Sequence, residues 1–171
     1  QLFAVTSAVG RMVDPIAYRD ALGTFATGVT VVTFAVDGTD HGITVNSFAS
    51  LSLDPPLVLW NCDVEATSHA PLEDADSYAV NVLSADQEWL SNRFAGEHHE
   101  MDDPFEDVDV HRGETGSPLV GETLATIDCS IEQRLPGGDH TIYVGRVEDL
   151  AVGDDEADPL LFFRGEYREI A

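Results

Sequence analysis

Stretches rich in β-branched and apolar residues recur along this chain, and they restrict it to a mainly β fold. They cover residues 30–36, 41–53, 57–62, 78–83, 124–135, 140–152 and 160–170. Such residues favour strands, and many strands separated by turn signals favour antiparallel sheets. The pattern predicts a closed antiparallel barrel with two or three helices packed outside it.

Turn and cap residues divide these stretches. Asp37-Gly38 predicts a hairpin turn after the first stretch, and Asp54-Pro55-Pro56 ends the second. Asp14 before Pro15 is typical of a helix start, and apolar residues follow it at helical spacing. These are Ile16, Ala17, Ala21, Leu22 and Phe25.

A second helix is expected over residues 84–95, where Ser84 and Gln87 form a capping box. Residues 96–118 are polar and irregular, which predicts a long surface loop.

The length of 171 residues predicts one domain over residues 14–171, preceded by an N-terminal arm over residues 1–13. No apolar run approaches a membrane span, and no basic start precedes the first apolar stretch as a secretory signal requires. Cys62 and Cys129 lie far apart in the sequence and form no C-x-x-C motif. We therefore expect a cytoplasmic chain with reduced thiols.

The charge is strongly one-sided. The chain holds 32 acidic and 8 basic residues, for a net charge of −24, and every basic residue is an arginine. Nucleic acid and anionic membranes should repel such a chain. Acid enrichment with loss of lysine favours a halophilic protein of a high-salt cytosol, where screening weakens self-repulsion. The alternative is a calcium-binding or merely acidic protein, but no calcium-loop motif occurs.

Several familiar chemistries lack their motif. Residues 23–30, GTFATGVT, miss the lysine of a phosphate-binding P-loop and follow a helix instead of a strand. Neither the G-x-S-x-G elbow of serine hydrolases nor the G-x-G-x-x-G fingerprint occurs. His98 and His99 are adjacent in an acidic stretch, which is not a metal-ligand spacing, and we expect no metal site.

Two stretches could hold a ligand. Residues 44–56 place Asn46, Ser47, Ser50 and Ser52 among apolar residues, which indicates either a polar solvent face or hydroxyl contacts to a polar ligand. Residues 137–141, GGDHT, indicate either a hairpin turn with an ordinary histidine or an imidazole placed at a barrel mouth.

Together these stretches resemble the flavin reductase-like family, the FMN-binding split barrels. The resemblance spans about residues 14–170. Its motifs are FATGVTVVT (25–33), HGITVNSFASLSLDPPLVL (41–59), YAVNVLSADQEWLSNRFA (78–95), GSPLV (116–120), GGDHTIYVGRV (137–147) and LLFFRGEY (160–167). It implies a split antiparallel Greek-key barrel with flanking helices, working as a homodimer with flavin at the subunit interface.

The resemblance also implies site residues. The segment lining the flavin ring and ribityl chain corresponds to His41, Gly42, Ile43, Thr44, Asn46, Ser47 and Ser50, with Asn61 and Cys62 beside the ring. Thr67 and Ser68 correspond to the loop that meets the flavin phosphate. Family members often carry a basic residue near Thr67, which this sequence lacks.

For the nicotinamide, the resemblance implies His140, Arg164, Gly165 and Tyr167, with His140 as a positioning and electrostatic residue. It predicts an NAD(P)H-dependent flavin reductase that uses FMN, with FAD possible, and NADH or NADPH as electron donor. A flavin-dependent monooxygenase is the expected partner. Alternatives are a flavin carrier without nicotinamide turnover, or another redox enzyme of this fold, such as a ferric reductase or a pyridoxamine-phosphate oxidase relative.

Overall fold

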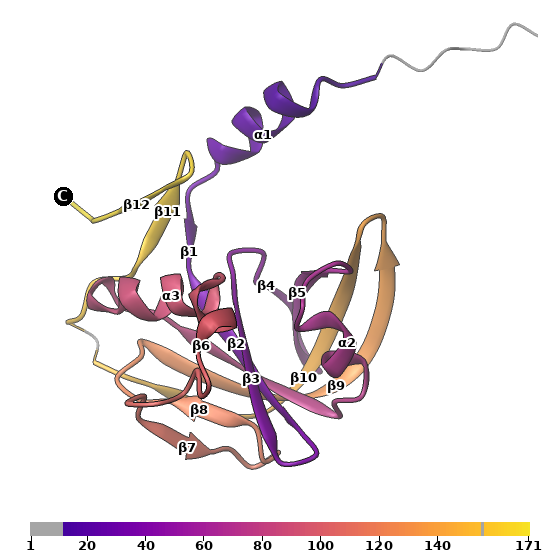
Figure 1. Cartoon of the computed structure of the whole chain (residues 1–171), viewed down its shortest axis with the longest axis vertical. Helices are drawn as coiled ribbons and strands as arrows, with labels where there is room; N and C mark the ends of the chain where they lie inside the picture. Colours follow the sequence, from indigo (N-terminus) through magenta and orange to yellow (C-terminus); the bar gives the residue numbers. More distant parts are fainter. Residues whose placement is uncertain (1–11, 155) are drawn as a thin grey trace, which may run out of the picture.

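A computed structural model describes residues 12–154 and 156–171, and it places most of the strands in one antiparallel sheet (Figure 1). That sheet has seven strands in the order β3-β2-β6-β9-β10-β5-β4. Its strands are β2 (Thr30–Val36), β3 (Thr39–Val45), β4 (Ala49–Leu53), β5 (Pro56–Asp63), β6 (Ser77–Val82), β9 (Ala125–Gly137) and β10 (His140–Val152).

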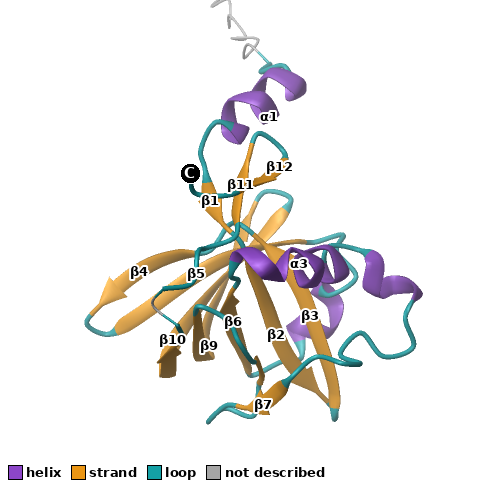
Figure 2. Ribbon diagram, turned by 90° about the vertical axis from the view of Figure 1, so that its left-hand side faces the viewer, coloured by secondary structure: helices purple, strands orange, loops and turns teal. Residues whose placement is uncertain are grey.

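The seven-stranded sheet curls into a barrel that is split rather than closed. Strands β3 and β4 are its two edges, and no hydrogen-bonded ladder joins them among the described residues. The expectation of a closed barrel was therefore wrong in this respect, while the split antiparallel architecture is confirmed. Figure 2 shows β4 and β5 splayed away from β2 and β3 on the other side of the sheet.

Two small sheets complete the strands. One joins β1 (Thr27–Gly28), β11 (Leu161–Phe163) and β12 (Glu166–Arg168), so it brings the two ends of the chain together. The other pairs β7 (Val110–Arg112) with β8 (Pro118–Val120).

The helices are short. They are α1 (Pro15–Gly23), α2 (His69–Glu73) and α3 (Glu88–Phe94), with 3₁₀ turns η1 (Ala85–Gln87) and η2 (Glu97–Glu100). Asp14 caps α1, because its carboxylate accepts the Ala17 N–H at 2.9 Å, and the predicted capping box of Ser84 and Gln87 is present before α3. No helix in the described part of the chain has the length and apolarity needed to cross a bilayer.

Aromatic residues fill the barrel. Trp60 is fully buried, stacks on Tyr143 with ring centroids 5.2 Å apart, and meets Tyr78 edge-on at 5.7 Å. A second apolar cluster lies under α3 and includes Leu90 and Phe94. Burying large apolar side chains on both sides of β2 and β6 stabilises the sheet that carries the site.

Three predicted elements differ from those observed. The stretch 41–53 is two strands, because β3 pairs with β2 while β4 pairs with β5 at the opposite sheet edge, so the chain must leave the sheet between them. The predicted loop 96–118 contains η2 and β7 and ends at the start of β8. The stretch 160–170 is a hairpin that turns at Arg164-Gly165, where both residues have positive φ.

Helix α1 stands away from the barrel (Figures 1 and 2). It has no buried residue, and the apolar positions Ile16, Leu22 and Phe25 are 71%, 57% and 78% exposed. The helical spacing was therefore read correctly, but none of the residues that the structure describes covers its apolar side. The predicted arm over residues 1–13 lies mostly outside the described residues.

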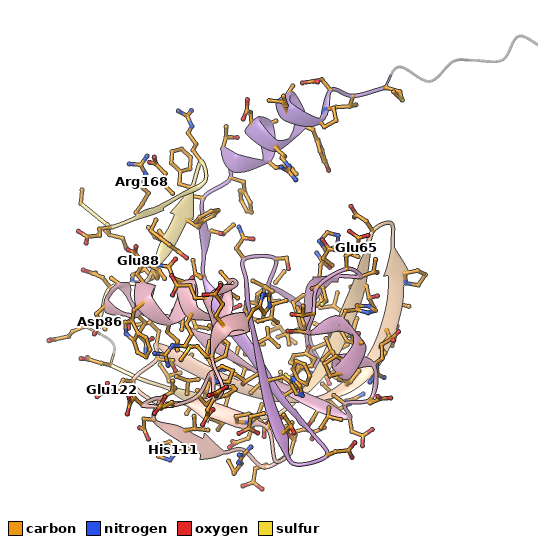
Figure 3. The ribbon with its side chains drawn as sticks, viewed as in Figure 1. Glu65, Asp86, Glu88, His111, Glu122 and Arg168 are labelled. Carbon is orange, nitrogen blue, oxygen red and sulfur yellow. The ribbon has the colours of Figure 1, made fainter. Side chains whose placement is uncertain are left out.

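Acidic side chains are distributed over the surface rather than gathered in one place. Figure 3 labels Glu65, Asp86, Glu88 and Glu122, which are all exposed; Glu65, Glu122 and the neighbouring pair Asp86 and Glu88 come from three separate parts of the chain. Among the described residues, arginines form ion pairs with carboxylates in Arg112–Asp40, Arg146–Glu132 and Arg168–Glu166. Cationic groups left for an anionic ligand are therefore few.

Candidate functional site

A cleft lies between β3 and α3, and the C-terminal hairpin closes one side of it. This β3–α3 cleft has a volume of about 160 Å³. It is lined by Val29, Thr44, Val45, Asn46, Ser91, Ala95, Phe162 and Tyr167. Its walls are mainly apolar with hydroxyl groups among them, as expected for a site that holds a flat ring with polar edges.

A chain of hydrogen bonds fixes the three elements around this cleft. The Thr44 hydroxyl donates to the Ser91 carbonyl at 2.7 Å, and the Ser91 hydroxyl lies 2.7 Å from the Tyr167 oxygen. Tyr167 in turn donates to Asn92 Oδ1 at 3.1 Å. Strand β3, helix α3 and strand β12 are thereby held in one arrangement around the cleft.

A second hollow, the histidine pocket, adjoins the other end of β3. Its volume is about 210 Å³, and it is lined by Asp40, His41, Gly42, Thr67, Ser68, Pro71, His99 and Pro104. The Thr67 hydroxyl lies 2.8 Å from His99 Nε2, which links the loop before α2 to η2.

The electrostatics of the histidine pocket are set by His41 and Asp40. Burial lowers the pKa of His41, and the neighbouring Asp40 opposes that shift. Both Asp40 oxygens accept hydrogen bonds from Arg112, each at 2.7 Å, so its carboxylate charge is compensated by β7. His41 also stacks on Phe34 with ring centroids 5.0 Å apart, which fixes its ring.

The cleft and the histidine pocket share two walls. Strand β3 contributes Gly42 to the pocket and Thr44 to the cleft, and the segment from α3 to η2 faces both. Gly42 is required at this place, because a Cβ there would lie 2.6 Å from the Phe94 ring. Two to three residues of extended strand separate the hollows, which is about 7–10 Å.

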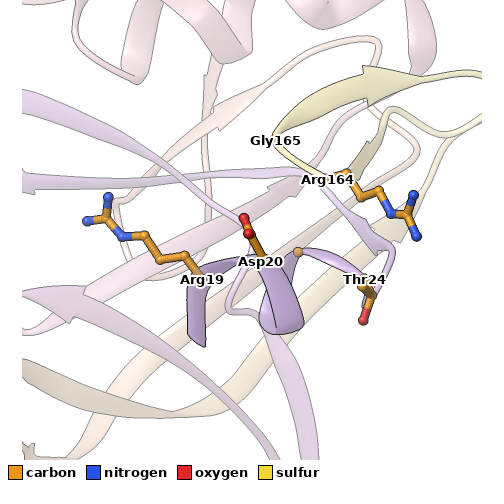
Figure 4. A pocket seen from close by; sticks show the side chains of 6 residues that line it. Arg19, Asp20, Thr24, Arg164 and Gly165 are labelled. Atoms are coloured by element: carbon orange, nitrogen blue, oxygen red, sulfur yellow. The ribbon is translucent and has the colours of Figure 1, made fainter. Parts of the chain in front are cut away.

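A third hollow, the arginine cavity, lies between the end of α1 and the β11–β12 turn (Figure 4). It has a volume of about 470 Å³ and is lined by Arg19, Asp20, Gly23, Thr24, Arg164 and Gly165. The Arg164 N–H donates to the Gly23 carbonyl at 2.8 Å, which joins its two sides. No ion pair connects Arg19 or Arg164 to a carboxylate among the described residues.

A comparison of the sequence with models of known protein families assigns this split barrel to one family. The flavin reductase like domain family matches residues 22–171, which is most of the chain. The chain belongs to this family.

Two relatives are similar over most of this chain and most of their own length. "FMN reductase (NADH) SmoA" of Agrobacterium fabrum is 43% identical over 151 residues, which cover 88% of this chain and 83% of that protein. "Flavin-dependent monooxygenase, reductase subunit HsaB" of Rhodococcus jostii is 41% identical, over 92% of this chain and 79% of that protein.

Among solved structures, the NADH:FAD oxidoreductase SgcE6 of Streptomyces globisporus superposes with a TM-score of 0.86. It is 39% identical, over 94% of this chain and 98% of that chain. Another structure of SgcE6 was determined in complex with NAD and FAD fragments.

The structure brings many of the residues that the resemblance implied into these hollows. Thr44, Asn46 and Tyr167 line the β3–α3 cleft, and Arg164 and Gly165 line the arginine cavity. His41, Gly42, Thr67 and Ser68 line the histidine pocket, while Ile43 lies on β3 between the pocket and the cleft.

The residues implied beside the flavin ring have other contacts. Ser47 exchanges two hydrogen bonds with the backbone of Asn61, at 3.0 and 3.2 Å, and thereby ties the segment after β3 to β5. Ser50 lies exposed on β4. The Cys62 side chain is fully buried in the core, where burial raises its thiol pKa to about 11, so this thiol has no nucleophilic character near neutral pH.

His140 opens β10 as predicted, but it lines none of the three hollows of its own chain. It lies at the tip of the β9–β10 hairpin, and its Nδ1 is 2.8 Å from the exposed carboxylate of Asp139. Its role near the nicotinamide stays a prediction, and it requires that His140 reach the site of a second copy of the chain.

Several residues of these hollows were not predicted as site residues, among them Ser91, His99 and Arg19. The sequence presents His99 only as the neighbour of His98 in an acidic stretch, and the described residues contain no group of three or more side chains that could hold a metal ion. Arg19 lies on the first helix, which the sequence predicts from its apolar positions. The sequence does contain a feature that could have pointed to Arg19. Only 8 basic residues occur beside 32 acidic ones, so each arginine is a candidate for contact with an anionic ligand.

Proposed function

We propose that this chain is an NADH-dependent flavin reductase that supplies reduced flavin to a monooxygenase. The observation that carries the proposal is an identity of about 40% over most of the chain to proteins named as an NADH-dependent FMN reductase and as a monooxygenase reductase subunit. The nicotinamide supplies a hydride from its C4, and flavin N5 accepts it. The protein needs to hold two rings in contact and to exclude water.

The β3–α3 cleft holds the flavin ring in this proposal. Val29, Val45 and Phe162 provide apolar contact to a ring face, and the hydroxyls of Thr44 and Tyr167 and the amide of Asn46 provide polar contact to its edge. FMN and FAD share this ring and its ribityl chain, and both occur in the names of similar proteins.

The site is completed by a second copy of the chain. The cleft of one chain, at about 160 Å³, is smaller than the roughly 300 Å³ at which ligand pockets of ordinary size begin. The exposed apolar side of α1 and the 94% exposed Leu53 on the edge strand β4 offer surface for a homodimer interface. In such a homodimer the hairpin that carries His140 can approach the cleft of the other copy.

The nicotinamide dinucleotide binds along the β11–β12 hairpin. Phe162 and Tyr167 of this hairpin line the cleft, while its turn carries Arg164 and Gly165 into the arginine cavity. Arg164 and Arg19 there face the diphosphate, which needs cationic donors. NADH is the donor in this proposal, because similar proteins are named as using NADH.

The surface charge also supports a high-salt cytosol as the working environment. With a net charge of −24 and no lysine, self-repulsion is strong in dilute buffer and is screened over about 3 Å in molar salt.

The test is anaerobic reduction of FMN by NADH with protein purified in molar KCl. Catalytic amounts of protein should bleach the flavin absorbance, and light scattering should give twice the chain mass of 18.5 kDa. Flavin that binds yet stays yellow with NADH and with NADPH would indicate a carrier instead. A protein that neither binds nor reduces flavin would exclude both functions.

A further inference from the structure

The histidine pocket has the features of an anion site without any arginine or lysine of its own. Its lining supplies the hydroxyl groups of Thr67 and Ser68 and the imidazoles of His41 and His99. The carboxylate in the lining, Asp40, is already engaged by Arg112 through two hydrogen bonds of 2.7 Å. The lining therefore offers donors to an anion, and its positive charge depends on the protonation of two histidines.

The position of this pocket identifies the anion. It lies about 7–10 Å along β3 from the cleft that we assign to the flavin ring. A five-carbon ribityl chain joins the ring of FMN to its phosphate and spans a gap of this order. The flavin phosphate is thus the anion that reaches the histidine pocket when the ring is in the cleft.

The hydrogen bond between Thr67 and His99 gives protonation a second effect. When Nε2 of a neutral His99 is unprotonated, it accepts the Thr67 hydroxyl hydrogen at 2.8 Å, so that hydrogen is not available to a ligand. When His99 is protonated, Nε2–H donates to Thr67 Oγ1, and the Thr67 hydroxyl hydrogen turns toward the pocket. One proton therefore adds a charge and releases a donor.

His41 acts in the same direction. Burial lowers its pKa, which favours the neutral imidazole, whereas an incoming phosphate dianion favours the protonated form. Other charged or titratable groups on the surrounding elements include Glu65 before α2, His69 and Glu73 of α2, Glu88 and Arg93 of α3, Glu97 and Glu100 of η2, and Asp102 and Asp103 before Pro104. The Arg93 guanidinium donates to the carbonyls of Pro104 and Glu106, which holds this acidic segment in place.

We propose that His99, assisted by His41, holds the flavin phosphate, so that the protein binds FMN more tightly as the pH falls from 8 to 6 while its affinity for riboflavin stays constant. This inference rests on the proposed flavin reductase function. It assigns the cationic role in phosphate binding to titratable imidazoles in place of a lysine or arginine. The phosphate itself takes up a proton near pH 6, which sets the lower end of this range.

The test compares FMN with riboflavin, which has the same ring and ribityl chain but no phosphate. Affinities are measured by flavin fluorescence at fixed ionic strength between pH 6 and pH 8.5. The wild-type ratio of FMN to riboflavin affinity should fall about tenfold from pH 6 to pH 8, as for the loss of a charge-assisted hydrogen bond. His99→Gln should lower the ratio at pH 6 about tenfold and weaken its pH dependence.

Two further variants separate the pocket from general effects. Thr67→Val should lower the same ratio, because it removes the donor that His99 controls. His111→Gln should leave the ratio unchanged, because His111 is an exposed histidine on β7 outside the pocket. A ratio in His99→Gln within twofold of wild type at every pH would overturn the assignment.

The failure of this inference and the failure of the proposed function give different results. If the protein catalyses reduction of flavin by NADH but binds FMN and riboflavin with equal affinity, the reductase function stands and the phosphate site is refuted. If the protein binds neither flavin and oxidises no NADH, both are refuted.

Discussion

The histidine pocket shares strand β3 with the β3–α3 cleft and the arginine cavity shares the β11–β12 hairpin with it, yet the two hollows are built differently. The pocket has buried wall residues, Gly42 and Ser68, that belong to the barrel and the loop before α2. The side chains around the arginine cavity are exposed, and one backbone hydrogen bond, from Arg164 N to the Gly23 carbonyl, joins its two sides. The first is shaped by the core, and the second is assembled from the two ends of the chain.

The two hollows also differ in the kind of positive charge they offer. Imidazoles change charge between pH 5 and pH 8, whereas guanidinium groups keep theirs at every pH that a protein tolerates. On our proposals, the flavin phosphate is held by a charge that varies with pH and the dinucleotide by a charge that does not. In a chain this acidic, each anionic substrate needs a local cation, and this chain meets that need in two ways.

The largest effect is expected from filling the space where the pocket meets the cleft. Gly42→Ala forces the Phe94 ring to move, since a Cβ would lie 2.6 Å from it. Overpacking of this kind should lower the free energy of unfolding by about 1–3 kcal/mol. FMN affinity should fall at least about tenfold, because the walls on both sides of the ribityl chain shift.

Gly28→Ala is the matched control for Gly42→Ala, because no atom lies within 4 Å of a Cβ built at Gly28. Thermal unfolding measures the stability of both variants, and FMN titration measures their affinity for FMN. Equal stability and equal FMN affinity of the two variants would show that the Phe94 ring moves aside at little cost, against the expectation from its packing on Gly42.

A smaller effect, confined to the other substrate, is expected at the arginine cavity. Arg164→Gln should raise the KM for NADH about tenfold and leave kcat nearly unchanged, because it removes a phosphate contact made equally in the ground and transition states. Turnover with 1-benzyl-1,4-dihydronicotinamide, which carries no phosphate, should not change. Arg146→Gln is the control, since Arg146 pairs with Glu132 on the barrel.

Steady-state kinetics with both donors checks the Arg164 prediction. A similar loss with the phosphate-free donor would mean that Arg164 acts on the ring or on the hairpin, where it now lies over the Phe163 ring at 5.1 Å. The assignment of the cavity to the diphosphate would then be wrong.

The contrast between a hollow shaped by local strands and one assembled from distant segments also explains which features could be predicted from the sequence. Strands β2 and β10 have the bounds expected from their β-branched runs, and the Asp37-Gly38 turn is present with both residues at positive φ. These features depend on residues close together in the chain, where propensity and turn chemistry decide the outcome.

Features that depend on distant contacts were missed. Thr67 and His99 are 32 positions apart, and only the packing of η2 against the loop before α2 brings them together. Similarly, the spacing of Ile16 and Leu22 predicts a helix but contains no information about what covers it. The break after Val45 follows from the sheet order, which places β3 and β4 at opposite edges.

The smallest effect is expected from changing a charge beside the histidine pocket without touching its donors. Arg112→Gln releases Asp40 from its two hydrogen bonds of 2.7 Å and leaves an uncompensated carboxylate in the lining. FMN affinity should fall about threefold at low salt, with riboflavin affinity unchanged, because a partly exposed charge acts weakly through water. Molar KCl should remove most of the difference.

Asp40→Asn in the Arg112→Gln background should restore FMN affinity, because it removes the carboxylate that Arg112 compensates. Arg168→Gln serves as the control, since the Arg168–Glu166 pair is exposed and outside the pocket. Fluorescence titration of both flavins at two salt concentrations measures these effects. Equal weakening of FMN and riboflavin by Arg112→Gln would mean that the Arg112–Asp40 pair supports the fold of β3 rather than the charge of the pocket, and the electrostatic contrast between the two hollows would lose one of its supports.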